Sequence, residues 1–152
     1  MTYNPNNYDY SIIIKKINTF IFQKVTNSNS NGIIIGLSGG IDSSVCLALA
    51  ANSLPGHNIL GLILPIDEIT PKQDIDDAIF LAKKYKIEYR IIKINNINSE
   101  YMKNLVYEKI TQGNLFARIR MNILYYHANL MNRLVIGTGD KSEYLLGYFT
   151  KF

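Results

Sequence analysis

The chain has few of the residues that build disulfide frameworks and metal clusters, and it has no long apolar run. Its 152 residues include one cysteine, two histidines and no tryptophan. A single cysteine excludes an internal disulfide, as is typical of a reducing cytosol, and no Cys/His cluster suggests a zinc site. The apolar runs are too short to cross a bilayer, and the start lacks the basic and apolar regions of a secretion signal. We therefore expect a cytoplasmic protein that makes no membrane contact.

Charged residues are also sparse, at 18% of the chain, and their balance is only mildly positive. The 16 Lys and Arg residues exceed the 12 Asp and Glu residues, which gives a formal net charge of +4. That charge suits a polyanionic nucleotide but is too diffuse to predict nucleic-acid binding. With 47% hydrophobic residues, the chain has the composition of one globular domain over residues 1–152.

Apolar runs rich in isoleucine alternate with amphipathic stretches along the chain. The expected strands are residues 33–37, 59–64, 88–94 and 134–137. The expected helices are residues 8–25, 43–52, 70–85, 98–110, 114–132 and 141–146. Thr70, Pro71 and Gln73 have the pattern of a capping box, and Gly113 is expected to separate two helices. Strands separated by helices predict an α/β fold with a doubly wound parallel sheet, whose ligand binds beyond the carboxyl ends of the strands.

The most informative stretch follows the first expected strand and precedes the next helix. It reads Ser38-Gly39-Gly40-Ile41-Asp42-Ser43-Ser44. Glycines let backbone N–H groups approach an anion, and a helix N-terminus adds unpaired N–H groups and the positive end of its dipole. Asp42 would repel a phosphate unless a divalent cation, most simply Mg²⁺, lies between them. The stretch therefore predicts a phosphate site that works with a metal, in preference to a serine-capped turn.

This stretch resembles the pyrophosphate loop, S-G-G-x-D-S, of enzymes that split ATP between its α and β phosphates. That superfamily includes NAD, GMP and asparagine synthetases and tRNA-modifying enzymes, so the loop alone predicts adenylation chemistry and no substrate. Two later stretches narrow the choice, Gly113-Asn114-Leu115-Phe116-Ala117-Arg118-Ile119-Arg120-Met121 and the run from Gly137-Thr138-Gly139-Asp140-Lys141-Ser142-Glu143 to Gly147-Tyr148-Phe149-Thr150-Lys151-Phe152. Together they resemble NAD synthetase, which amidates deamido-NAD, over about residues 32–152.

The resemblance implies a Rossmann-like sheet of the adenine nucleotide alpha hydrolase type, in strand order 3-2-1-4. This order brings the loops after the first and fourth strands to one crevice. The resemblance assigns ATP binding to Gly36, Leu37, Ser38, Gly39, Gly40, Ile41, Asp42, Ser43 and Thr138. It assigns Mg²⁺ to Asp42 and Glu143 and deamido-NAD to Arg118 and Lys151, with no further catalytic residue beyond these binding groups. Arg120 is a weaker candidate, because residues two apart do not share a helix face.

The implied reaction has two steps. ATP adenylates the nicotinate carboxylate of deamido-NAD with release of pyrophosphate, and ammonia then displaces AMP. Free ammonia, or ammonia from a separate protein, is the expected nitrogen source. The resemblance also implies a homodimer, for which residues 114–132 offer a broad apolar face that includes Met121, Leu124 and Tyr125.

One departure from the family concerns the end of the chain. NAD synthetases continue past the position of Phe152 with a fifth strand and C-terminal helices. We therefore expect an incomplete domain with little activity of its own. Two alternatives stay open at this point. The chain could be a family fragment that binds a nucleotide without turnover, or another pyrophosphate-loop enzyme such as a tRNA-modifying one.

Overall fold

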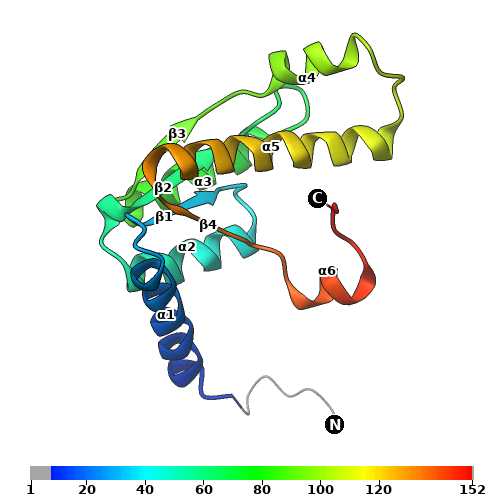
Figure 1. Ribbon diagram of the computed structural model, residues 1–152. Helices are drawn as coiled ribbons and strands as arrows, with labels where there is room; N and C mark the ends of the chain where they lie inside the picture. The colour runs from blue at the N-terminus through cyan, green and yellow to red at the C-terminus, as the bar shows by residue number, and fades with distance from the viewer. Residues whose placement is uncertain (1–7, 152) are drawn as a thin grey trace.

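A parallel sheet with helices on both faces organises the molecule. The computed structural model describes residues 8–151 (Figure 1). Its helices are α1 (Tyr10–Asn27), α2 (Ile41–Ser53), the short 3₁₀ helix η2 (Gly56–Asn58), α3 (Lys72–Lys84), α4 (Asn95–Met102), α5 (Lys109–Met131) and α6 (Lys141–Leu146). Its strands are β1 (Ile33–Gly36), β2 (Ile59–Ile63), β3 (Glu88–Ile91) and β4 (Leu134–Ile136). They pair in parallel in the order β3-β2-β1-β4, which confirms the expected doubly wound α/β fold and its strand order.

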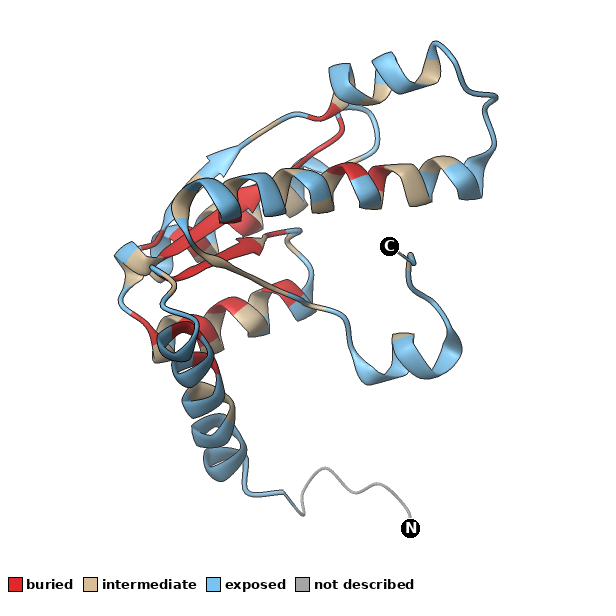
Figure 2. Ribbon diagram, in the orientation of Figure 1, coloured by how far each residue is buried: buried red, intermediate tan, exposed pale blue. Residues whose placement is uncertain are grey.

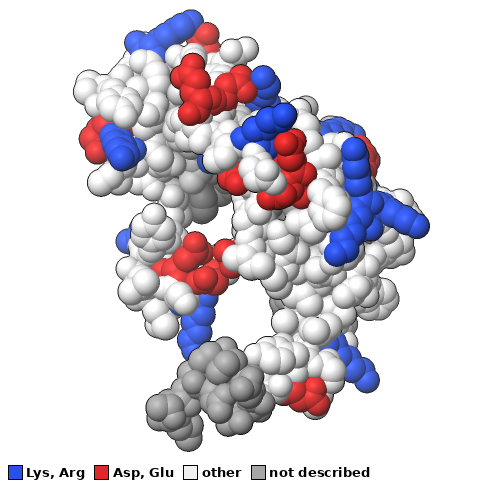
Figure 3. All heavy atoms as spheres, turned by 180° about the vertical axis from the view of Figure 1, so that it is seen from behind, with Lys and Arg blue, Asp and Glu red and all other residues white. Residues whose placement is uncertain are grey.

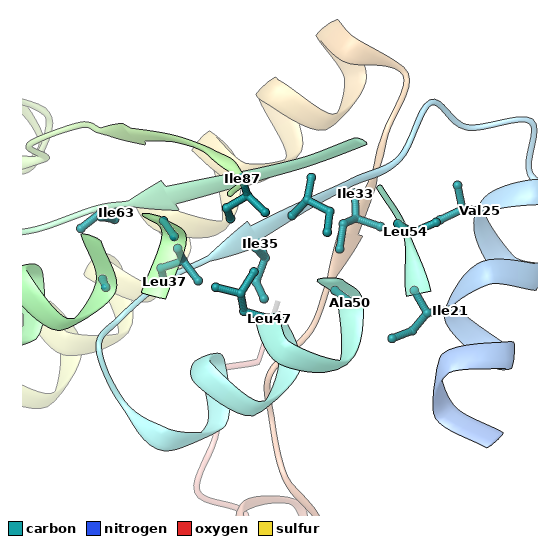
Figure 4. Close-up of a cluster of buried hydrophobic side chains, with 13 residues drawn as sticks. Ile21, Val25, Ile33, Ile35, Leu37, Leu47, Ala50, Leu54, Ile63 and Ile87 are labelled. Atoms are coloured by element: carbon teal, nitrogen blue, oxygen red, sulfur yellow. The ribbon is translucent and has the colours of Figure 1, made fainter. Parts of the chain in front are cut away.

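Side chains of the inner strands alternate between the two faces of the sheet, and each face has its own core. On one face, Ile33 and Ile35 of β1 pack with side chains of α1, α2 and α3 (Figure 4). On the other face, Ile34 of β1 packs with Leu60 and Leu62 of β2 and with side chains of α5. The inner strands β1 and β2 are accordingly buried (Figure 2), as parallel strands covered on both faces generally are, whereas β3 is largely exposed. This double cover fixes the position of β1 and of the loop that follows it.

The helices expected on either side of Gly113 are divided differently in the structure. α4 ends at Met102, and α5 then runs without a break from Lys109 to Met131, with Gly113 inside it. The prediction of a helix over residues 98–110 and of a break at Gly113 is therefore wrong. The start of α5 is marked by Glu108, whose carboxylate accepts from the N–H groups of Ile110 (3.1 Å) and Thr111 (2.6 Å). One glycine weakens a helix by about 1 kcal/mol relative to alanine, too little to end a helix that packs along a sheet.

The start of α3 also differs from the predicted capping box. α3 begins at Lys72, and no side chain caps its first turn. The Thr70 hydroxyl instead accepts from the N–H of Ile66 (3.0 Å), and the Gln73 amide donates to Asp77 (2.9 Å). Thr70 thus stabilises the loop after β2 and does not cap the helix.

The segment after β4 leaves the sheet and then returns to α5. It leads to α6, which lies apart from the sheet, and the last residues come back toward α5 (Figure 1). Two hydrogen bonds hold this return. Arg118 Nη2 donates to the Lys151 carbonyl (2.8 Å), and Thr150 Oγ1 donates to Asn114 Oδ1 (2.7 Å). α6 itself is exposed to solvent except at Glu143, which is half-buried (Figure 2).

Charge is distributed over the surface in small groups of both signs. On the face in Figure 3, Lys and Arg side chains alternate with Asp and Glu side chains and with uncharged areas. That face therefore carries no continuous stripe of one sign. Across residues 8–151, none of the helices has the length and apolar character needed to span a bilayer.

Candidate functional site

The loop between β1 and α2 is folded by its own serines. We call residues 38–44 the phosphate loop. Its Ser43 is buried, and the Ser43 hydroxyl donates to the Gly40 carbonyl (3.0 Å) and accepts from the Ser38 N–H (3.3 Å). The Ser38 hydroxyl in turn accepts from the Gly40 N–H (3.2 Å). These bonds shape the loop without any ligand, so the side chains of Ser38 and Ser43 serve the loop itself.

The same loop leaves a group of backbone donors unpaired. Within the described chain, the N–H groups of Gly39, Ile41, Asp42 and Ser43 donate to no protein acceptor. These donors surround the N-terminus of α2, whose N-cap, Gly40, offers no side chain as a cap. Unpaired N–H groups at a helix N-terminus, together with the positive end of the helix dipole, bind anions. The phosphate loop thus offers what the phosphates of a nucleotide need.

Gly39 shows why this loop needs a glycine. Its φ is +83°, in the left-handed region that residues with a side chain avoid. A Cβ atom at this position would also overlap the backbone of Asp74 in the first turns of α3. The phosphate loop therefore lies directly against α3, and a substitution at Gly39 would separate the two.

A cleft of about 440 Å³ opens at the carboxyl ends of β1 and β2. Gly36, Ser38 and Thr138 line one side of it, where the phosphate loop begins. Most of the remaining surface is apolar and includes Leu64 and Pro65, which follow β2. An adenine nucleotide requires N–H donors for its phosphates at one side and an apolar surface for its base at the other.

The loops after β1 and β4 meet at this cleft, as the sequence predicts. β1 and β4 are hydrogen-bonded neighbours, and the Cys46 thiol of α2 lies 3.9 Å from the Gly137 carbonyl, directly before Thr138. Burial and the nearby charge of Asp42 raise the pKa of the Cys46 thiol. A raised pKa is the opposite of what a nucleophilic cysteine needs, so Cys46 serves the packing of α2.

The two predicted metal ligands lie in the first turns of α2 and α6. Asp42 is exposed and forms no ion pair with another described residue. Glu143 takes part in a capping box, in which its Oε2 accepts from the Asp140 N–H (3.1 Å) and Asp140 Oδ1 accepts from the Glu143 N–H (2.7 Å). This capping leaves lone pairs of the Glu143 carboxylate available to a metal.

The donor set fits Mg²⁺ better than it fits a metal held by protein alone. Mg²⁺ is usually bound by one or two carboxylates together with phosphate oxygens and water. Within residues 8–151, no group of three or more His, Cys, Asp or Glu side chains could hold a metal ion. A metal at Asp42 and Glu143 would therefore need phosphate oxygens of the nucleotide among its ligands.

The structure brings the two positions predicted for deamido-NAD together. Arg118 Nη2 donates to the Lys151 carbonyl at 2.8 Å, although the residues are 33 positions apart. Both residues are exposed, so their charges are available to an anionic ligand. The contact joins α5 to the segment after α6.

Arg120 is a cleft residue to which the sequence gives too little weight. It is half-buried, lines the cleft, and its Nε donates to the Leu64 carbonyl at 3.1 Å. Burial lowers the pKa of its guanidinium, which nonetheless stays charged. The spacing of Arg118 and Arg120 in the sequence is the feature that could have indicated two separate binding roles. Two residues apart, they leave α5 in different directions, one toward Lys151 and the other into the cleft.

Known proteins provide an independent comparison for this site. The family model described as NAD synthase matches residues 13–152. The NH(3)-dependent NAD(+) synthetase of Staphylothermus marinus is 49% identical over 150 residues, which are 96% of this chain and 54% of that protein. The chain thus spans about half the length of the curated relatives it matches.

Two solved structures share the fold closely. The NH3-dependent NAD synthetase of Campylobacter jejuni, in complex with a nitrate ion, has a TM-score of 0.89 and 42% identity, over 94% of this chain and 62% of that one. The NMN synthetase of Francisella tularensis has a TM-score of 0.89 and 36% identity, over 96% of this chain and 61% of that one. Since the family match covers almost the whole chain and agrees with its motifs and strand order, the chain belongs to the NAD synthase family.

Proposed function

We propose that the protein amidates deamido-NAD to NAD, using ammonia and ATP. The observation that carries this proposal is the phosphate loop, whose unpaired N–H groups lie beside a cleft with an apolar opposite side. Membership of the family supplies the reaction class, a ligase that forms a C–N bond. Another pyrophosphate-loop enzyme, such as a tRNA-modifying one, would not explain a family match that extends across the motifs after the loop.

In the proposed first step, a carboxylate oxygen of the nicotinate group attacks the α-phosphorus of ATP. The bond from the α-phosphorus to the oxygen that bridges it to the β-phosphorus breaks, and pyrophosphate leaves. N–H groups of the phosphate loop bind the leaving phosphates and stabilise the charge that develops on them. In the second step, ammonia attacks the acyl carbon, AMP leaves with the electrons of the C–O bond, and the surplus proton goes to solvent.

Binding and orientation do most of the remaining work, because ammonia is nucleophilic once deprotonated. Thr138 is proposed to contact ATP, and Arg118 and Lys151 to bind the anionic groups of deamido-NAD. Asp42 and Glu143 are proposed to hold Mg²⁺, which would supply positive charge to offset that of the phosphates.

The protein is further proposed to be a cytoplasmic homodimer. Its Cys46 is a free thiol, as is typical of proteins from a reducing compartment. The outer face of α5 exposes Tyr125, Tyr126 and Leu130, and an apolar patch of this kind is suited to contact with a second copy.

The test places the chain inside a full-length relative. In a chimera, residues 1–152 replace the matching part of the Staphylothermus marinus protein, and the chimera receives ATP, deamido-NAD, ammonium and Mg²⁺. NAD, AMP and pyrophosphate are expected in equal amounts by chromatography. Formation of ADP and phosphate, or the absence of NAD from a folded chimera, would contradict the proposal.

A second candidate product is NMN. It is favoured by the neighbour from Francisella tularensis named NMN synthetase, whose TM-score equals that of the NAD synthetase neighbour. The same chemistry would amidate nicotinate mononucleotide, which lacks the adenylyl half of deamido-NAD. The chimera assay with both acceptors distinguishes them. We expect kcat/KM to be at least about tenfold higher for deamido-NAD, and the reverse preference would favour NMN.

A further inference from the structure

We infer that Arg120 binds the α-phosphate of the nucleotide in the cleft and so positions the phosphorus at which the reaction occurs. The inference rests on the proposed function, because it needs an adenine nucleotide in this cleft. Arg120 would be the third basic residue of the site. It would bind the nucleotide, whereas Arg118 and Lys151 are proposed to bind deamido-NAD.

The place of Arg120 follows from its helix neighbours. Arg120 and Leu124 are one turn apart, so they lie on the same side of α5. Leu124 faces β1, since a Cβ atom on Gly36 would lie 3.5 Å from its Cδ1. α5 leads into β4, which is parallel to β1, so the N-terminal part of α5 lies toward the carboxyl ends of the strands. Arg120 therefore lies beyond Gly36, over the start of the phosphate loop.

The hydrogen bond to Leu64 fixes the direction of the guanidinium group. Its Nε donates to the Leu64 carbonyl on the apolar side of the cleft (3.1 Å). Its Nη1 and Nη2 make no hydrogen bond to any residue in the described range 8–151. A guanidinium held at Nε presents its two remaining nitrogens as a planar fork, which matches two oxygens of a phosphate.

The charge of Arg120 is not balanced by a protein carboxylate. None of the ion pairs among the described residues includes Arg120, and Asp74 is the one other charged residue that lines the cleft. A half-buried cation without a partner favours a ligand that brings negative charge. Arg120 lies between the phosphate loop and the apolar surface at Leu64. A nucleotide with its terminal phosphates in the loop and its base on that surface would place its α-phosphate there.

The experiment compares ligands with and without this phosphate. Isothermal titration calorimetry measures the affinities of the 152-residue chain and of Arg120→Gln for ATP with Mg²⁺, AMP and adenosine. We expect Arg120→Gln to weaken ATP and AMP binding by about 10- to 100-fold, as for a lost hydrogen bond to a charged group, and to leave adenosine binding nearly unchanged. Equal weakening of all three ligands would show a merely structural role, and unchanged AMP affinity would show no role. Either result overturns the inference.

Two further variants separate charge, geometry and folding. Arg120→Lys keeps the charge but loses the fork, so AMP affinity should fall between those of the wild type and Arg120→Gln. Lys109→Gln, at the exposed start of the same helix and outside the cleft, is the control and should leave AMP affinity unchanged. Loss of the fold in both Arg120 variants, judged by circular dichroism, would overturn the inference.

The outcomes also separate this inference from the proposed function. If the wild type binds ATP and Arg120→Gln binds AMP equally well, the inference fails and the proposed function stands. If the wild-type chain binds no adenine nucleotide, the inference fails, and the chimera assay decides the proposed function separately.

Discussion

Asp42 constrains the chemistry of the nucleotide site most, because its carboxylate lies among N–H groups suited to an anion. Asp42 stands among the unpaired N–H groups of the phosphate loop, in the first turn of α2. Two like charges about 4 Å apart repel by about 4 kcal/mol at the effective dielectric of a protein surface. That repulsion would offset much of the attraction from the N–H groups, so a cation between Asp42 and the phosphates is the arrangement that makes the residue useful.

Asp42→Asn should therefore remove the effect of Mg²⁺ on nucleotide binding. The amide has the shape of the carboxylate, so the fold of the loop should survive, while the metal ligand is lost. Calorimetric titrations with ATP, with and without Mg²⁺, should give a large difference for the wild type and almost none for the variant. Asp76→Asn is the matched control, because Asp76 is an exposed residue of α3, and this variant should behave as the wild type does. Mg²⁺-dependent affinity that persists in Asp42→Asn would refute the metal assignment.

Single residues of the site differ in how far the sequence predicts them. The phosphate loop is predictable, because its glycines, helix start and serines act through local backbone geometry. Glu143 is compatible with two roles on sequence grounds, and the structure gives it the capping contact with Asp140, while its metal role stays a prediction. The place of Arg120 depends on how α5 crosses the end of β2, a tertiary relation that no local pattern contains.

At the scale of elements, strands were easier to predict than helix ends. Each expected strand contains the observed one and begins at the same residue. The inner strands β1 and β2 were the clearest, because strands covered on both sides are short, nearly continuous apolar runs. Helix limits depend on caps and on packing. The carboxylate of Glu108 caps the start of α5, and the helix then continues through Gly113, where a break was expected. The Thr70 hydroxyl, expected to cap α3, accepts a hydrogen bond within its own loop instead.

Gly113→Ala should stabilise the protein, because Gly113 lies inside α5. A Cβ atom there would meet no other atom within 4 Å, and the φ of Gly113 is not positive. Alanine lowers the backbone entropy of the unfolded chain, so the free energy of unfolding should rise by about 0.5–1 kcal/mol.

Urea denaturation followed by circular dichroism measures this change. Gly39→Ala is the contrasting variant and should lower stability, because its φ is +83° and its Cβ would overlap Asp74. A Gly113→Ala variant less stable than the wild type would contradict a continuous α5.

For the whole molecule, the apolar residues of α5 divide into two groups. Leu124, expected on the face available to a partner, packs in the core against the sheet together with Ala128 and Met131. Tyr126 and Leu130, one turn apart, are 65% and 67% exposed. The dimer prediction therefore depends on a smaller surface than the sequence suggests.

The 152-residue chain should form dimers or larger species at micromolar concentration. Multi-angle light scattering should give a mass above that of the monomer, and Tyr126→Glu combined with Leu130→Glu should shift it toward the monomer by adding charge to the contact. Tyr144→Glu on α6, where the side chain is 73% exposed, is the control and should have little effect. A clean monomer of the wild type would contradict the prediction.

A polypeptide of these 152 residues, made alone, should bind ATP yet form little NAD. Its phosphate loop and cleft are formed by the sheet and the helices around it. The positions proposed for deamido-NAD are different, since Arg118 and Lys151 are exposed and the segment that carries Lys151 follows an exposed α6. A substrate held from one side loses the geometry of attack, and a misplacement of about 1 Å can cost about 100-fold in rate. NAD formation by the chain should therefore be at least about 100-fold slower than by the chimera at equal concentration. Turnover by the chain alone at roughly 1 s⁻¹ or more would show that it holds both substrates without further residues.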